Sequence, residues 1–65
     1  MKISRIKFDL ARARACMSQG DFEKAGIPRG TLNRAMNERS VMPETIGKIA
    51  KALGVDVTEI IDTDN

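Results

Sequence analysis

Apolar residues recur at helical spacing in several short segments of this chain, and no segment alternates with the period of two typical of a β-strand. The clearest segment begins with Pro43 and Glu44, which suit the first turn of a helix. It is followed by Gly54, which stops the helix. Its apolar positions follow the i, i+3, i+4, i+7 rule: Ile46, Ile49, Ala50 and Leu53. Together with the segments below, this pattern predicts an all-α fold of five short helices.

Residues 1–17 contain no glycine or proline and are rich in Ala and Arg, which predicts a helix with an ambiguous apolar face. One stripe comprises Ile3, Ile6, Leu10, Ala13 and Met17. The other, on nearly the opposite side, comprises Phe8, Ala11 and Ala15. Either the helix begins near Ile6 after an irregular start, or one stripe contacts a partner subunit. The first interpretation is favoured.

Two segments carry the residues of a capping box, in which a cap residue and an acid three positions later satisfy each other's backbone amides. Ser18 and Asp21 predict a second helix from about Gln19 to residue 24 or 25. Asp56 and Glu59 predict a short fifth helix that ends near residue 62.

Between these segments, Gly26 provides a sharp turn, and Pro28 fixes the entry to a third helix over about residues 28–37. The apolar face of this helix is formed by Leu32, Ala35 and Met36. The opposite face carries Gly30, Asn33, Arg34 and Asn37, with Arg29 at the exposed start. Arg and Asn match the edges of guanine and adenine in the major groove, which is wide enough for a helix. The simpler alternative is a solvated polar face.

Composition excludes several classes of function. With no histidine and the single cysteine Cys16, internal disulfides and the usual zinc sites are excluded, and we expect no metal or cofactor. No nucleophile has a plausible base nearby, so we expect no enzyme. The charged residues of the first segment exclude a signal peptide. We therefore expect a single cytoplasmic domain over residues 1–65, in which Met17, Met36 and Met42 fill the core.

Charge is distributed unevenly along the chain, although the net charge is only +2. Residues 1–39 hold nine basic and four acidic side chains, and residues 40–65 hold two basic and five acidic ones. This asymmetry favours contact of the first part with a polyanion such as DNA.

The chain resembles Cro and lambda-repressor type (XRE-like) helix-turn-helix proteins from Phe8 to Ile61. The likeness is carried by residues 18–19 with Phe22, by residues 25–27 and 31–32, and by residues 43–55. It implies a lambda-repressor-like domain with the helix-turn-helix at the second and third helices. The implied function is a transcriptional regulator, a repressor, that binds specific double-stranded DNA sequences.

The resemblance also implies roles for individual residues. Base contacts correspond to Arg29, Gly30, Thr31, Asn33 and Arg34. Phosphate contacts correspond to Gln19, Asn37, Arg39 and Arg12. In the family, the arginine at the position of Arg12 often pairs with an acid on the third helix, which is Met36 here. Arg12 is therefore either a phosphate contact or a solvated side chain.

A single reading helix gains affinity when two copies bind half-sites about 34 Å apart. The residues expected to form a homodimer surface are Val55, Val57, Ile60 and Ile61, and the alternative is that they are buried within one chain.

A second hypothesis for function is a small helical protein-interaction module, such as an antitoxin-like partner. Its binding would survive high salt, whereas phosphate contacts would not.

Overall fold

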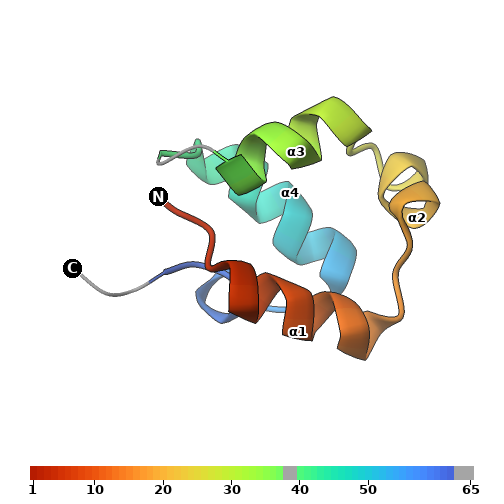
Figure 1. The fold of residues 1–65 in the computed structure, drawn as a ribbon, viewed down its shortest axis with the longest axis horizontal. Helices are drawn as coiled ribbons and strands as arrows, with labels where there is room; N and C mark the ends of the chain where they lie inside the picture. Colours follow the sequence, from red (N-terminus) through yellow and green to blue (C-terminus); the bar gives the residue numbers. More distant parts are fainter. Residues whose placement is uncertain (38–39, 63–65) are drawn as a thin grey trace.

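The computed structural model describes residues 1–37 and 40–62. In these residues four helices follow one another: α1 (Arg5–Ala15), α2 (Gln19–Lys24), α3 (Arg29–Asn37) and α4 (Pro43–Leu53) (Figure 1). A single 3-10 turn, η1 (Val57–Glu59), follows α4. The described part of the chain contains no β-strand and only one isolated antiparallel bridge, between Ile3 and Ile61. The all-α class predicted from the sequence is therefore confirmed.

The fifth helix is shorter than predicted. The capping box of Asp56 and Glu59 forms, but Ile60 already leaves the helical conformation at φ −125°. The backbone of the following residues pairs instead with the start of the chain, where Ser4 N–H donates to the Ile60 carbonyl and Asp62 N–H to the Lys2 carbonyl, both over 2.8 Å. This tertiary pairing ends the helix before residue 62.

The predicted ends of α2 and α4 are confirmed. Ser18 N–H donates to the Asp21 carboxylate over 2.8 Å, and Asp21 N–H donates to the Ser18 hydroxyl over 3.4 Å. These hydrogen bonds to Ser18 lower the pKa of Asp21. Gly26 after α2 and Gly54 after α4 have φ values of 88° and 73°, which residues with a Cβ adopt at a cost.

The irregular start of α1 resolves its ambiguous pattern. The helix begins at Arg5, one residue before the predicted start. Phe8 and Ala11 face the core, and the ring of Phe8 stacks on that of Phe22 with centroids 5.9 Å apart. Ile6 and Leu10, from the other stripe, are 75% and 60% exposed.

The residues expected to form a homodimer surface contribute to the core of this chain to different extents. Ile60 is completely buried. The other three pack against the core and are partly buried: Val55, Val57 and Ile61. The pairing of residues 60–62 with residues 2–4 draws Ile60 into the core, so for Ile60 burial within one chain is the correct alternative.

Candidate nucleic-acid interface

The turn between α2 and α3 is fixed by backbone hydrogen bonds and one buried side chain. Gly26 N–H donates to the Glu23 carbonyl over 3.0 Å, and Ile27 N–H donates to the Phe22 carbonyl over 2.8 Å. Ile27 and Phe22 are both buried, so the turn is anchored in the core. Pro28, just before α3, accepts a hydrogen bond from Leu32 N–H over 3.0 Å. The two helices are therefore held as one unit.

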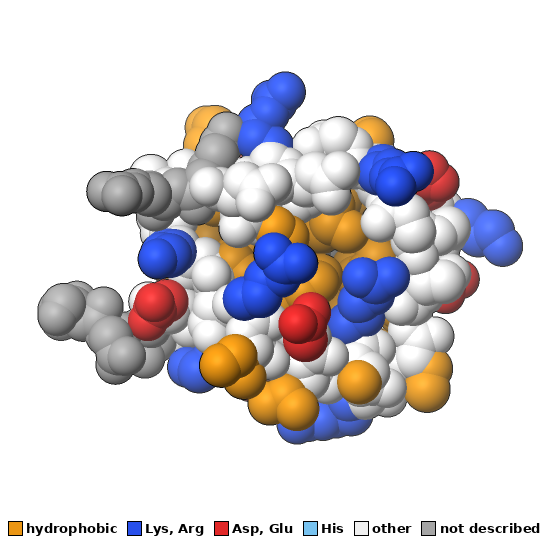
Figure 2. Space-filling model, in the orientation of Figure 1, with side chains coloured by type: hydrophobic (Ala, Val, Ile, Leu, Met, Phe, Trp, Pro, Cys, Tyr) orange, Lys and Arg blue, Asp and Glu red, His pale blue; other side chains and the backbone are white. Residues whose placement is uncertain are grey.

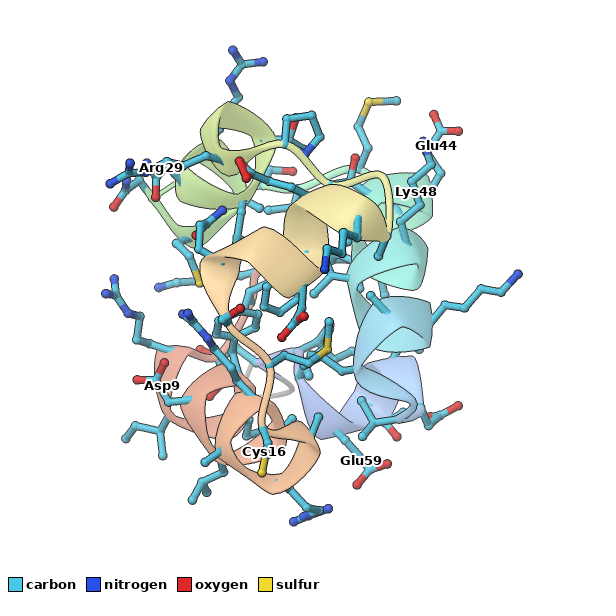
Figure 3. All side chains as sticks on the ribbon, turned by 90° about the vertical axis from the view of Figure 1, so that its right-hand side faces the viewer. Asp9, Cys16, Arg29, Glu44, Lys48 and Glu59 are labelled. Atoms are coloured by element: carbon cyan, nitrogen blue, oxygen red, sulfur yellow. The ribbon has the colours of Figure 1, made fainter. Side chains whose placement is uncertain are left out.

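α3 has one buried and one exposed face, as its pattern predicts. Leu32 and Ala35 are each only 3% exposed, and Met36 is partly buried. All five residues expected to contact bases are exposed: Arg29, Gly30, Thr31, Asn33 and Arg34. α3 and α1 lie on opposite sides of the molecule (Figure 1). The Arg29 side chain points away from the body of the protein (Figure 3).

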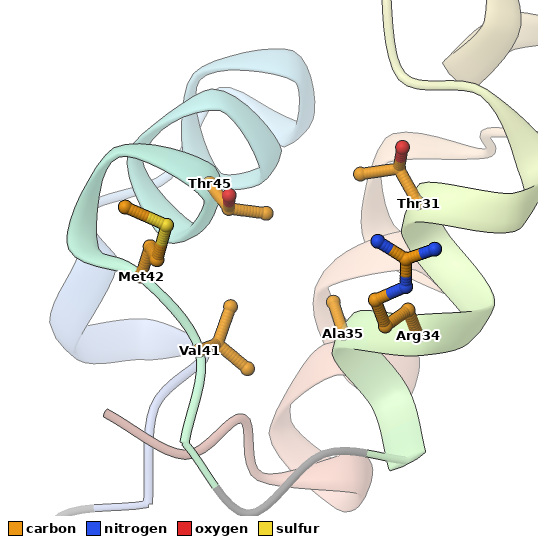
Figure 4. A pocket seen from close by; sticks show the side chains of 6 residues that line it. All are labelled: Thr31, Arg34, Ala35, Val41, Met42 and Thr45. Atoms are coloured by element: carbon orange, nitrogen blue, oxygen red, sulfur yellow. The ribbon is translucent and has the colours of Figure 1, made fainter.

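Arg34 also borders a cleft between α3 and the start of α4 (Figure 4). The other lining residues are Thr31, Ala35, Val41, Met42 and Thr45. Met42 is 63% exposed, so its assignment to the core was wrong. The extended conformation of Met42 before Pro43, at φ −65° and ψ 139°, carries its side chain outward. The proline was the only signal in the sequence for this placement.

The residues expected to contact phosphate are in different situations. Gln19, at the start of α2, is half-buried, and its Nε2 is the one buried side-chain nitrogen or oxygen without a hydrogen-bond partner among the described residues. Asn37 is exposed, and its Nδ2 donates to the Asn33 carbonyl over 2.9 Å. Arg39 lies outside the described residues.

Arg12 occupies the junction of α1 and α2. Its Nε donates to the Met17 carbonyl over 2.9 Å, and its guanidinium carbon lies 5.7 Å from the centre of the Phe22 ring. These contacts fix a half-buried guanidinium at this junction. Arg12 is thus more ordered than a solvated side chain.

On the face shown in Figure 2, positive charge is spread out rather than gathered in one stripe. Figure 2 shows Lys and Arg side chains distributed over the face of the molecule turned toward the viewer, with fewer Asp and Glu side chains between them. Arg14 forms an ion pair with Glu59 at 3.4 Å, and both side chains are exposed. Exposed pairs of this kind contribute little to stability.

In the described residues, no group of three or more His, Cys, Asp or Glu side chains is arranged to hold a metal ion. None of the helices in residues 1–37 and 40–62 is long and apolar enough to span a membrane.

A family model described as helix-turn-helix matches residues 10–60, which include α2, α3 and α4. No curated protein and no solved structure matches the chain.

Proposed function

Because the chain belongs to the XRE-type helix-turn-helix family of DNA-binding regulators, we propose that it is a repressor that reads a specific DNA sequence with α3. The observation that carries this proposal is the division of α3 into two faces. Leu32 and Ala35 anchor the helix in the core, while its Arg and Asn side chains face solvent. A helix held in this way fits the major groove of B-form DNA.

The exposed residues of α3 have distinct parts in this proposal. Arg29 and Arg34 each bind a guanine through its O6 and N7 atoms, and one such pair discriminates against the wrong base by about 1–3 kcal/mol. Asn33 suits an adenine edge. Gly30 permits close approach, since no atom lies within 4 Å of the position where a Cβ would stand. Thr31 contributes its hydroxyl or methyl group.

Gln19 and Arg12 position the protein on the DNA backbone. The Nε2 of Gln19 has no hydrogen-bond partner among the described residues, and an outward turn of this side chain would let it donate to a phosphate oxygen. Arg12 brings a positive charge fixed by Met17 and Phe22. Asn37 and Arg39 complete the proposed phosphate contacts, which carry no sequence information themselves.

The protein would repress by occupying its operator. The test is selection from random duplexes with purified protein, repeated with three variants. Arg29→Ala and Arg34→Ala should each relax the preference at particular base pairs, whereas Gln19→Ala should weaken all sites by a similar factor. If both arginine variants select the same sequence as the wild type, α3 is not the reading element.

A protein-interaction module is a second candidate, and the exposed side chains of Ile6 and Leu10 favour it. These residues belong to α1, which lies on the side of the molecule opposite α3 (Figure 1). The salt dependence of binding distinguishes the two functions. The logarithm of DNA affinity falls with the logarithm of salt concentration with a slope of about −0.9 per phosphate contacted. Binding to an apolar face at Ile6 and Leu10 should persist at high salt, and Leu10→Gln should weaken it.

A further inference from the structure

The outer face of α1 carries apolar side chains that no segment of the described chain covers. Ile6 is 75% exposed and Leu10 is 60% exposed, and Ala13 beside them is exposed as well. These three residues follow the spacing i, i+4, i+7, so they lie in one row on the side of the helix opposite the buried Phe8 and Ala11. We name the row formed by Ile6, Leu10 and Ala13 the α1 patch.

Charged side chains border the α1 patch on both flanks. On one flank, Lys7 Nζ donates to the Ile61 carbonyl over 3.3 Å, and Arg14 forms its ion pair with η1. On the other flank, Arg5 and Asp9 are exposed, and the side chain of neither makes a hydrogen bond or an ion pair within the described residues. This second flank therefore offers one positive and one negative group to a partner.

This charge pattern is complementary to itself in an antiparallel pair of helices. A two-fold axis brings the same flank of each helix together in reversed order. When Ile6 packs on Leu10 of the second copy, Arg5 of each copy lies two residues, or about 3 Å along the helix axis, from Asp9 of the other. An arginine side chain spans that offset. A parallel pair would instead place like charges beside each other, so the charges favour an antiparallel second copy.

We propose that the α1 patch binds the α1 patch of a second copy in this antiparallel arrangement, and that the dimer bridges two DNA duplexes. Because α1 and α3 lie on opposite sides of the molecule (Figure 1), such a dimer carries its two α3 helices on opposite sides. Each α3 then contacts a different duplex, rather than one of two half-sites about 34 Å apart on the same duplex. The bridging rests on the proposed function, whereas the self-association does not require DNA.

The contact is small, since a stable interface buries roughly 800 Å² on each partner and three aliphatic side chains supply less. We therefore expect weak association, which becomes stronger when DNA holds two copies close together. Sedimentation velocity of the free protein, in a concentration series up to the millimolar range, should show wild-type monomer passing into dimer. Leu10→Gln should remain monomeric over the same series. A wild-type protein that stays monomeric, or a dimer that survives Leu10→Gln, would overturn the proposal.

Charge exchange tests the antiparallel contact. Arg5→Glu and Asp9→Arg each place like charges along the shared flank, so each variant alone should dimerise about tenfold more weakly than wild type. Mixed in equal amounts, the two variants should form a heterodimer at least as readily as wild type, because opposite charges then alternate along the flank. Lys48→Glu is the matched control, since it changes the net charge as Arg5→Glu does at an exposed position of α4, and it should dimerise normally. A mixture that associates no better than its components would refute the contact.

Bridging is measured by whether an immobilised operator duplex retains a second, labelled operator duplex. Retention should appear at the concentration at which half of the wild-type protein is dimeric. Leu10→Gln should bind the immobilised duplex and retain no second one, and an unchanged melting temperature checks that it folds. A wild-type dimer that binds the operator and captures no second duplex would refute the bridging and leave the proposed function intact. A protein that selects no DNA sequence would refute the proposed function and the bridging, while sedimentation still decides whether the α1 patch forms a dimer.

Discussion

Gly30→Ala should change stability and DNA binding in opposite directions. Gly30 lies in the first turn of α3, its φ is not positive, and no atom lies within 4 Å of the added Cβ. Alanine at such a position stabilises a helix relative to glycine by about 0.5–1 kcal/mol, because it restricts the unfolded chain. For a domain of this size, the melting temperature should rise by about 2–8 °C.

The same methyl group would stand on the surface that approaches the bases. We therefore expect Gly30→Ala to bind the selected operator less tightly although the protein is more stable. Gly47→Ala is the matched control, since Gly47 is also in a helix, in α4, with no atom within 4 Å of its added Cβ. This variant should gain stability and keep its DNA affinity.

Thermal unfolding followed by circular dichroism gives the melting temperature, and fluorescence anisotropy with a labelled operator gives the DNA affinity. Unchanged operator affinity in Gly30→Ala would refute the close approach of α3 to the bases at this position. A lower melting temperature in Gly30→Ala would contradict the helical backbone and the open space at this position, on which the expected stabilisation depends.

Three further predictions concern the elements that position α3. Phe22→Ala should cost about 3–5 kcal/mol, most of the stability of about 3–10 kcal/mol expected for this length, and chemical denaturation should show Phe22→Leu to be much milder. Since the hydrogen bonds of Ser18 lower the pKa of Asp21 from 3.8, its carboxylate stabilises the fold above that pH, and the stabilisation is lost as the pH falls through the folded-state pKa. Acid unfolding should accordingly be shallower in Asp21→Asn; an identical pH dependence would contradict the capping role. Arg12→Gln should reduce the salt slope of DNA binding by about 1, whereas an unchanged slope would leave Arg12 a purely structural residue.

Local signals in the sequence predicted most of the helices. The caps at Ser18 and Asp56 and the glycines after α2 and α4 act through neighbouring backbone groups, so residue spacing was sufficient to locate them. The two faces of α3 followed from the periodicity of its own residues.

Features that depend on contacts between distant segments were not predictable in this way. η1 stops early and Ile60 is buried because residues 60–62 pair with residues 2–4. Met42 was assigned to the core from its residue type, and nothing local indicated that α3 and α4 would leave it beside a cleft. The engagement of Arg12 with Met17 and Phe22 likewise needed the packing of α1 against α2.

The central claim is that the exposed face of α3 contacts DNA, and amide chemical-shift mapping of this 65-residue chain tests it most directly. On titration with the selected duplex, the largest changes should occur at Gly30, Asn33 and Arg34, with smaller changes at Gln19. Ile6 and Leu10 on α1 should change little. Changes concentrated on α1, with α3 unaffected, would contradict the account.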